Sequence, residues 1–353
     1  MSGAAAYGYE GVMTSGITES LGLFAAGVVL LLLGGDLLVR GAVALAERHG
    51  VPPLTVGLTL VAFGTSAPEL ALNVAAASSG ATALTFGNMT GSSLTNIGMV
   101  LGLSALVRPV KVQSSLLRRE LPVLLGTVCL LLALCWLPGA LGQKGPLGLT
   151  RADGAVLLCG FAGFVGMLLR AARQPVRVGA PLAEAVSEAA RREPLMSWPL
   201  ATVMVLGGLA LLGIGGNLGE QGAVGAALSL GLSQQLVGLT VVSVATTLPE
   251  LVTSLMAVRR GQSDMALGNI VGSNIFNLLF ILGTAALIRT VPLPPGGTVI
   301  LLAVLGFTLL LFPLSITFDW TITRPEGLLL FMLYLAFMGW QLWLGLAAPA
   351  ALP

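Results

Sequence analysis

Residues 57–103 read GLTLVAFGTSAPELALNVAAASSGATALTFGNMTGSSLTNIGMVLGL, and residues 238–284 read GLTVVSVATTLPELVTSLMAVRRGQSDMALGNIVGSNIFNLLFILGT. The two stretches align without a gap at an offset of 181 residues, with 17 identities in 47 positions. The identities include polar residues and helix breakers, which chance does not repeat in so apolar a chain. They include Thr65/Thr246, Pro68/Pro249, Glu69/Glu250, Asn88/Asn269, Gly91/Gly272, Ser92/Ser273 and Asn96/Asn277. The chain therefore contains an internal repeat.

The composition indicates that most of the chain lies in lipid. Of its 353 residues, 56% are hydrophobic and only 9% are charged, whereas a soluble protein carries about a quarter charged residues. Such a chain has too little polar surface for water, so we expect a lipid bilayer around it. No strongly basic block indicates binding to nucleic acid.

Ten segments are long and apolar enough to cross a bilayer as helices of about 20 residues. They are 20–46, 52–78, 82–107, 118–138, 150–171, 196–217, 233–258, 263–288, 295–313 and 324–346. The longest polar connection, 172–194, separates two sets of five. We therefore expect an all-α membrane protein of ten transmembrane helices, with a first half at 1–171 and a second at 195–353.

Corresponding helices of the two copies are five spans apart, so the second copy is expected to cross the membrane in the opposite direction. Inverted repeats are typical of secondary transporters and place a binding site near the midplane. With both termini outside, 14 of the 17 Lys and Arg residues fall in cytoplasmic loops, and the others are Lys144, Arg151 and Arg289. Because basic residues favour the cytoplasm, we expect extracytoplasmic termini, a cytoplasmic 172–194 loop and location in the plasma (inner) membrane.

Glu69 and Glu250 are the only acidic residues deep within the predicted spans, and no basic residue lies deep enough to pair with either. An unpaired carboxylate in a membrane costs several kcal/mol. Two carboxylates about 5 Å apart repel by roughly 3 kcal/mol at an effective dielectric of 20. Bound cations or protons are therefore needed to neutralise the pair.

Each glutamate follows a proline and two hydroxyl residues, in GTSAPE at 64–69 and ATTLPE at 245–250. Because proline removes a backbone donor, we expect the carbonyls of Ala62 and Ser243 to lack helical partners. Carbonyl, hydroxyl and carboxylate oxygens are the ligands that Ca²⁺ and Na⁺ prefer. The alternative is a helix that restarts after a capping box, in which Ser66 or Thr247 caps the helix with the glutamate three residues on.

A second polar stripe follows each glutamate. Asn88, Ser92 and Asn96 are spaced to share one helix face, and Asn269, Ser273 and Asn277 repeat the spacing. We expect four of these to be ligands: Ser92, Asn96, Ser273 and Asn277. The glycines beside them are expected to allow close helix packing; they are Gly87, Gly91, Gly268 and Gly272.

These motifs resemble the two alpha-repeats of the calcium/cation antiporter superfamily, in particular the prokaryotic membrane proteins of its sodium/calcium exchanger branch. The resemblance lies in GTSAPE at 64–69 with GNMTGSSLTN at 87–96, and in ATTLPE at 245–250 with GNIVGSNIFN at 268–277. It implies a metal cluster between the second, third, seventh and eighth helices, with Ca²⁺ and Na⁺ as transported ions rather than cofactors. It also implies that the first and sixth helices slide across the others as a gate.

The resemblance further implies roles for individual residues. Glu69 and Glu250 would be shared carboxylates, and Thr65 and Thr246 would coordinate Ca²⁺ largely through backbone oxygen. Flanking Na⁺ sites would be completed by Ser66, Thr247, Ser92, Ser273 and the carbonyls of Ala62 and Ser243, while Asn96 and Asn277 would line the central position. Some relatives carry Asp where this chain has Asn277. The core charge is therefore at most −2, which one Ca²⁺ balances and which disfavours a K⁺-dependent cycle.

Together these features predict a secondary active antiporter, not an enzyme, that exchanges Ca²⁺ for Na⁺ by alternating access, acts as a monomer and needs no cofactor. A Ca²⁺/H⁺ antiporter is the alternative, although the proton-coupled branch typically has a Gly-Asn-x-x-Glu pattern in place of residues 64–69. Two inverted sites disfavour a passive channel, which more often builds a ring of like ligands. No nucleophile–base pair or zinc motif beside the glutamates favours an intramembrane enzyme.

Overall fold

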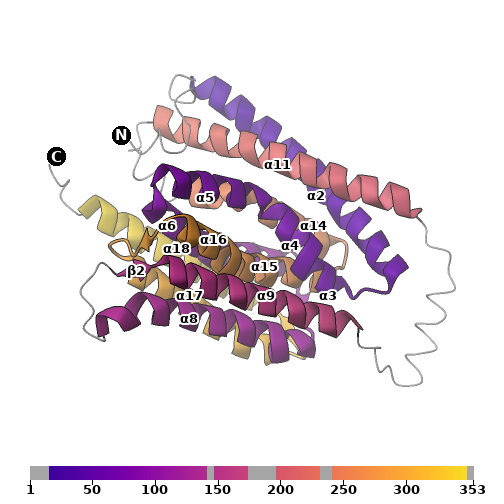
Figure 1. Ribbon diagram of the computed structural model, residues 1–353. Helices are drawn as coiled ribbons and strands as arrows, with labels where there is room; N and C mark the ends of the chain where they lie inside the picture. Colours follow the sequence, from indigo (N-terminus) through magenta and orange to yellow (C-terminus); the bar gives the residue numbers. More distant parts are fainter. Residues whose placement is uncertain (1–15, 141–146, 174–195, 231–240, 348–353) are drawn as a thin grey trace.

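The protein is almost entirely helical in the computed structural model, which describes residues 16–140, 147–173, 196–230 and 241–347 (Figure 1). The helices of the first half are α2 (Ile17–His49), α3 (Pro53–Val56), η2 (Gly57–Val61), α4 (Ala62–Thr65), α5 (Ala67–Ser79), α6 (Thr82–Thr95), η3 (Asn96–Leu101), α7 (Gly102–Val107), η4 (Leu116–Glu120), α8 (Leu121–Ala140) and α9 (Arg151–Arg173). Those of the second half are α11 (Trp198–Ser229), α13 (Ser243–Thr246), α14 (Leu248–Arg259), α15 (Ser263–Ile275), η6 (Phe276–Ile281), α16 (Leu282–Ile288), α17 (Gly297–Ile316) and α18 (Arg324–Ala347).

Eight helices in the described ranges are long and apolar enough to cross a membrane. A ninth candidate is the pair 53–65 and 67–79, which bends by 48° at Ser66. These nine match nine of the predicted spans. The first residues of the tenth, 233–258, lie outside the described chain, and α13 and α14 form its remainder. The loop 172–194 likewise falls outside the described residues beyond Arg173.

The predicted end of the sixth span is wrong. The sequence indicated 196–217, but α11 continues without interruption to Ser229. Asn217, Glu220 and Gln221 follow the predicted end. Asn217 and Glu220 line a cavity between α11 and the core helices, so these polar residues do not require the helix to end.

The repeat in the sequence recurs in the backbone. Ser66 and Thr247 occupy equivalent helix breaks with φ/ψ angles of −86°/2° and −88°/0°. Gly80 and Gly261, again 181 residues apart, both follow their helices with positive φ. Two short antiparallel ladders join the connections: β1 (Val110–Lys111) with β4 (Thr321–Ile322), and β2 (Gly148–Leu149) with β3 (Val291–Pro292). The strands β1 and β3 also lie at equivalent positions of the two copies.

Helices α2 and α11 form an antiparallel pair along one side of the molecule and also pack on α13 and α14 (Figure 1). Small residues recur every seven positions along their seam: Ser20, Gly27, Gly34 and Gly41 on α2, and Ala201, Gly208, Gly215 and Gly222 on α11. A Cβ added to Gly34 would lie 2.9 Å from the Gly208 carbonyl oxygen, and one on Gly41 would lie 2.7 Å from that of Ala201. The two backbones therefore touch, as small residues permit in membranes.

The predicted packing role of the core glycines is confirmed at three of four positions. A Cβ on Gly268 would lie 2.5 Å from the Leu54 carbonyl, and one on Gly272 would lie 2.8 Å from that of Leu58. Gly91 faces Ser243, whose Oγ would lie 3.3 Å away. Around Gly87, no atom of the described chain lies within 4 Å of such a Cβ, so that position shows no close contact.

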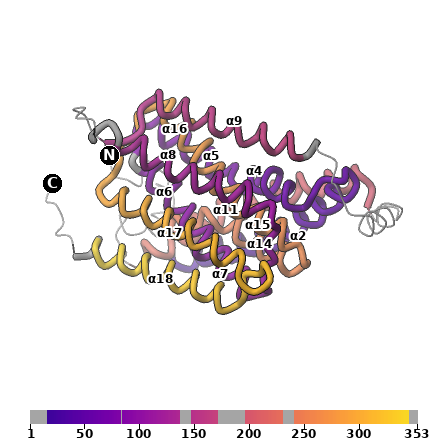
Figure 2. Tube along the Cα trace, turned by 90° about the horizontal axis from the view of Figure 1, so that it is seen from below, coloured from indigo at the N-terminus to yellow at the C-terminus, as the bar shows by residue number. Residues whose placement is uncertain are grey.

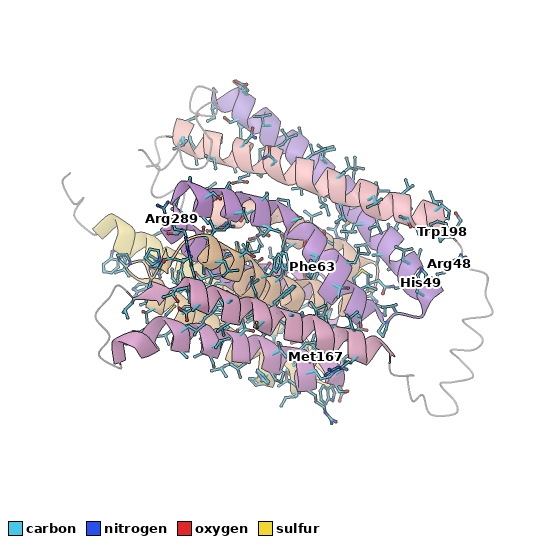
Figure 3. The ribbon with its side chains drawn as sticks, in the orientation of Figure 1. Arg48, His49, Phe63, Met167, Trp198 and Arg289 are labelled. Carbon is cyan, nitrogen blue, oxygen red and sulfur yellow. The ribbon has the colours of Figure 1, made fainter. Side chains whose placement is uncertain are left out.

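The remaining helices lie on one side of the α2–α11 pair (Figure 1). Seen from below, α8, α9, α17 and α18 spread across the face opposite α2 and α11 (Figure 2). Phe63, in the short α4, lies near the middle of the fold, with Arg48 and His49 at one end and Arg289 at the other (Figure 3). The ring of Phe63 packs 4.4 Å from that of Phe276. Aromatic packing thus holds the broken helix against η6.

Candidate cation-binding site

The two glutamates singled out in the sequence lie in the first turns of α5 and α14, directly after the two helix breaks. Their side chains are 1% and 0% exposed. Both carboxylate oxygens of Glu69 and one of Glu250 have no hydrogen-bond partner among the described residues. Two buried carboxylates thus leave three of their four oxygen atoms without a hydrogen bond from the described residues.

Each broken helix reaches toward the other half of the chain. Ser66 Oγ donates a 2.9 Å hydrogen bond to Glu250 Oε1 and lies 3.2 Å from Ser273 Oγ. Thr247, at the equivalent position, donates instead to the Ser243 carbonyl in its own helix at 2.8 Å. The two copies therefore bring together the same residues with different hydrogen bonds.

The threonines at the start of each motif are held by the asparagines of the following helix. Thr65 Oγ1 donates to Asn269 Oδ1 at 3.3 Å, and Thr246 Oγ1 donates to Asn88 Oδ1 at 3.5 Å. Each of these bonds joins one half of the chain to the other. Asn269 also donates to Ser254 Oγ at 3.0 Å, so its amide links α4, α14 and α15.

Residues of the polar stripe form further buried hydrogen bonds. Ser92 Oγ donates to Asn88 Oδ1 at 3.4 Å, and Asn96 Nδ2 donates to Asn274 Oδ1 at 3.2 Å. Neither amide atom of Asn277 has a partner in the described part of the chain. An unbonded amide is costly to bury, which marks this position as one that a ligand would complete.

The predicted site residues are all buried, and none is more than 8% exposed. They are Ala62, Thr65, Ser66, Glu69, Ser92, Asn96, Ser243, Thr246, Thr247, Glu250, Ser273 and Asn277. Their donor set is carboxylate, hydroxyl, amide and carbonyl oxygen. These are the ligands of hard cations such as Ca²⁺ and Na⁺.

The expectation of a free carbonyl at Ala62 is wrong. That oxygen accepts the backbone N–H of Ser66 at 3.0 Å and the hydroxyl of Thr65 at 3.3 Å. Pro68 removes the donor for the residue four positions before it, which is Gly64 rather than Ala62.

For Ser243 the expectation holds. The Thr247 amide turns to Val244 at 3.2 Å, and the Ser243 carbonyl accepts the hydroxyls of Thr246 and Thr247 instead.

The capping-box interpretation is also wrong. Neither α5 nor α14 has a side-chain cap at its N-terminus. Ser66 points its hydroxyl proton at Glu250 of the other half instead of accepting from its own helix. The hydroxyl and carboxylate residues are thus directed between the helices.

Two supporting asparagines were missed in the sequence. Asn73 Nδ2 donates to the Glu69 carbonyl at 2.7 Å, and Asn274 holds Asn96. Asn73 lies one helical turn after Glu69 and is 1% exposed. That spacing within an apolar span was the available signal for it. Asn274 aligns with Ser93, so the repeat did not single it out.

A cavity of about 270 Å³ leads to the pair from one side. It lies between α5, α11, α13 and α14. Its lining is Pro68, Glu69, Ala71, Leu72, Gly213, Gly216, Asn217, Glu220, Ala245, Thr246 and Pro249. Glu69 therefore lines a cavity that both helix breaks and the long helix α11 enclose.

Comparison with known proteins agrees with this geometry. The family model described as sodium/calcium exchanger protein matches residues 19–170 and 200–343. The chain is 37% identical to the putative antiporter CaxA of Alkalimonas amylolytica over 320 residues, which are 89% of this chain and 95% of that protein. It is 30% identical to the sodium/calcium exchanger MaX1 of Methanosarcina acetivorans over 345 residues, covering 91% of this chain and 98% of that one.

The fold has a solved counterpart as well. The sodium-calcium exchanger NCX_Mj, in crystals soaked with Na⁺ and Sr²⁺, superposes with a TM-score of 0.75 at 28% identity, over 92% of this chain and 98% of that one. The family match includes both broken helices and both glutamates. The chain therefore belongs to the sodium/calcium exchanger family, as a multi-pass membrane antiporter for Ca²⁺ and other cations.

Proposed function

We propose that this protein exchanges Ca²⁺ for Na⁺ across the plasma membrane by alternating access. The observation that carries the proposal is the pair of buried carboxylates, of which three of the four oxygens lack a hydrogen-bond partner in the described chain. Burying such groups without compensation costs several kcal/mol. Cations that enter the site and leave it supply the compensation in turn.

In this proposal Glu69 and Glu250 are shared between Ca²⁺ and Na⁺. The backbone oxygens of Thr65 and Thr246 complete the Ca²⁺ position, and their hydroxyls are already turned toward Asn269 and Asn88. The Na⁺ positions use Ser66, Thr247, Ser92 and Ser273 with the carbonyls of Ala62 and Ser243. Each carbonyl gains room for an ion when a threonine hydroxyl that now donates to it turns away. Asn96 and Asn277 line the centre, where the unbonded amide of Asn277 supports contact with an ion.

Competition for these carboxylates produces the exchange. An empty site carries about two unbalanced negative charges, so crossing without cargo is penalised. One Ca²⁺, or a set of Na⁺ ions, balances the charge and permits the change between the two open states. If a cycle moves net charge, the membrane potential contributes about 2.3 kcal/mol per charge per 100 mV.

The architecture proposed for this cycle is ten helices in two inverted halves, 1–171 and 195–353, with both termini outside and 172–194 in the cytoplasm. The antiparallel contact of α2 with α11, which are equivalent helices of the two copies, supports the inversion. These two helices pack on one another through their backbones along one side of the molecule (Figure 1). That arrangement supports movement of the pair as one body in a single polypeptide.

Protons are the alternative coupling ion, because two protons would remove the same two charges from the carboxylates. Ca²⁺ flux into proteoliposomes under separate Na⁺, K⁺ and H⁺ gradients distinguishes them. Na⁺ coupling predicts flux driven by the Na⁺ gradient alone. Ca²⁺ flux driven only by the pH gradient would show that H⁺, not Na⁺, is the coupling ion. Ca²⁺ flux that needs no counter-ion at all would contradict antiport.

A further inference from the structure

One face of α11 carries polar residues along the length of the cavity. Gly213, Gly216, Asn217 and Glu220 all line it, as residues three or four apart on one helix face do. Glu220 lies one turn beyond Gly216, or about 6 Å along the axis. Gly216 faces Pro249 beside the second glutamate, so Glu220 lies farther from the carboxylate pair, toward the other end of the cavity.

Two acidic residues, Glu69 and Glu220, line the cavity. Glu69, with both oxygens unbonded and 1% exposed, lies on its inner wall. No Lys, Arg or His is present among the described lining residues. A low-dielectric passage lined by one sign of charge concentrates ions of the other sign.

This carboxylate is not part of the repeat. The residue at the equivalent position of α2 is Val39, which is 0% exposed. When the site opens to the opposite side of the membrane, α2 would take the place that α11 has here. The passage on that side would therefore have Val39 where the present cavity has Glu220. A role for Glu220 is thus expected on one side of the membrane only.

We propose that Glu220 is an access ligand, which with Asn217 holds a partly hydrated cation in the cavity before the cation reaches Glu69 and Glu250. The inference rests on the proposed exchange and extends it to a residue outside both repeat motifs. Glu220 attracts the incoming ion, and the unbonded oxygens of Glu69 receive it once it sheds water. Because Glu220 lies on α11, movement of α11 with α2 would withdraw this ligand when the passage closes.

The test is the KM for Ca²⁺ of Glu220→Gln, measured separately in right-side-out and inside-out membrane vesicles. We expect the KM to rise roughly three- to tenfold in one vesicle type, as for loss of one charge near a water-exposed cation. Turnover at saturating Ca²⁺ and the KM in the other vesicle type should stay unchanged. Glu220→Asp keeps the charge and should restore most of the affinity.

Glu19→Gln is the matched control. Glu19 lies on exposed surface at the end of α2 that packs against Gly222, so it removes one negative charge near the same end of the helix pair. It should leave both KM values unchanged. An equal rise in both vesicle types, no rise for Glu220→Gln, or an equal rise for Glu19→Gln would overturn the inference. Absence of exchange in the unmodified protein would instead contradict the proposed function.

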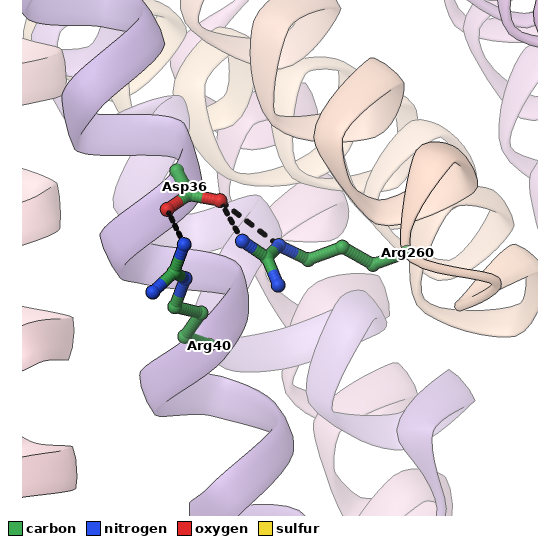
Figure 4. A network of polar contacts seen from close by, with 3 residues as sticks. All are labelled: Asp36, Arg40 and Arg260. Atoms are coloured by element: carbon green, nitrogen blue, oxygen red, sulfur yellow. Dashed lines mark hydrogen bonds and ion pairs between the residues drawn. The ribbon is translucent and has the colours of Figure 1, made fainter.

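A second, independent observation concerns the other end of the α2–α11 pair. Asp36 on α2 forms a 2.8 Å ion pair with Arg40, one turn along the same helix. It also accepts a 2.9 Å hydrogen bond from Nε of Arg260, the residue that directly follows α14 (Figure 4). Beside this contact Gly35 packs on Val252 and Met256. Charge and close packing thus join α2 to the core at the same place.

The equivalent positions of the other copy are neutral. Asn217 and Gln221 stand where α2 has Asp36 and Arg40, and they form the same contact one turn apart at 2.7 Å. Ser79 stands in place of Arg260 and donates to Ala76 in its own helix at 3.0 Å. Among the described residues, an ion pair to the core is therefore present at Asp36 and not at the equivalent Asn217, which lines the cavity.

The geometry points to the Asp36–Arg260 ion pair as a latch, meaning a contact that holds α2 against the end of α14. The latch keeps the site closed on the side of Asp36 while the cavity at Glu220 is open. It rests on the proposed movement of α2 and α11. The test is labelling of Met256→Cys by a membrane-impermeant thiol reagent, in protein whose native cysteines are replaced. Asp36→Asn or Arg260→Gln should speed labelling severalfold, and the double variant should add little to either.

Arg259→Gln is the matched control, since Arg259 neighbours Arg260, is exposed and forms no ion pair in the described chain. It should label at the unmodified rate. Unchanged labelling in both latch variants, or equal acceleration by Arg259→Gln, would overturn the latch. Because labelling is read without ion flux, its outcome is separate from that of the proposed exchange.

Discussion

Ser66 of the first half donates a 2.9 Å hydrogen bond to Glu250 of the second half, and no equivalent bond runs from Thr247 to Glu69. The two residues occupy the same position of the two copies, at helix breaks with nearly the same dihedral angles. A symmetric sequence pattern has therefore folded into a site with two different sides. The carboxylate of Glu69, which lines the cavity, thus accepts no hydrogen bond from the described residues, while that of Glu250 accepts one from Ser66.

Ser66→Ala is expected to weaken Na⁺ activation of Ca²⁺ flux by about tenfold. A hydrogen bond to a charged group contributes about 1.5–3 kcal/mol, and Ser66 also contacts Ser273. Thr247→Ala should cost less than about threefold, because its hydroxyl bonds to a backbone carbonyl of its own helix and a neutral bond is weaker. The Na⁺ dependence of flux in proteoliposomes measures both, and equal effects would contradict the asymmetry.

Asn277→Asp is expected to lower the Kd for Ca²⁺ by about tenfold. The substitution raises the core charge from at most −2 to −3, and a divalent ion gains most from the added charge in a buried site. Asn277→Ala is the neutral control, which removes the amide without adding charge and should not tighten Ca²⁺ binding. Isothermal calorimetry with the purified protein measures the change. A weaker affinity in the Asp variant would show that Asn277 lies away from the ion.

Gly208→Ala is expected to destabilise the protein, and Gly207→Ala is not. A Cβ at Gly208 would lie 2.6 Å from the Leu38 amide nitrogen and 2.8 Å from the Gly34 carbonyl oxygen, whereas one at Gly207 meets no described atom within 4 Å. Overpacking of this kind costs about 1–3 kcal/mol. Thermal unfolding in detergent should show a Tm several degrees lower for Gly208→Ala alone. Equal Tm values would mean that the α2–α11 seam has room to separate.

Much of the fold could be predicted because two strong patterns coincide in the sequence. Apolar length located nine spans that the described chain bears out, and the 181-residue repeat paired the residues that meet in the interior. The end of α11 could not be read in the same way. Apolar length cannot distinguish a polar residue that ends a span from one that, like Glu220, lines an internal cavity.

The sequence predicted which residues belong to the candidate site, but not which hydrogen bonds they form. Residue type and repetition identified the glutamates and their neighbours, because buried polar groups are rare in membranes and seldom recur by chance. The hydrogen bonds depend on atomic positions to within a few tenths of an ångström. Ser66 and Thr247 differ by one methyl group, yet they bond to different partners. Asn274 was missed since it has Ser93 as its counterpart and breaks the repeat.

The most direct test of the central claim is Na⁺-gradient-driven ⁴⁵Ca²⁺ uptake by proteoliposomes containing Glu69→Gln or Glu250→Gln. Each substitution keeps the side-chain shape and removes one of the two charges that a bound Ca²⁺ must balance. Folding is checked by Tm and by elution as a single species. We predict that the unmodified protein takes up Ca²⁺ and that each variant, although folded, takes up none above background. Retained uptake in both folded variants would contradict a site centred on Glu69 and Glu250.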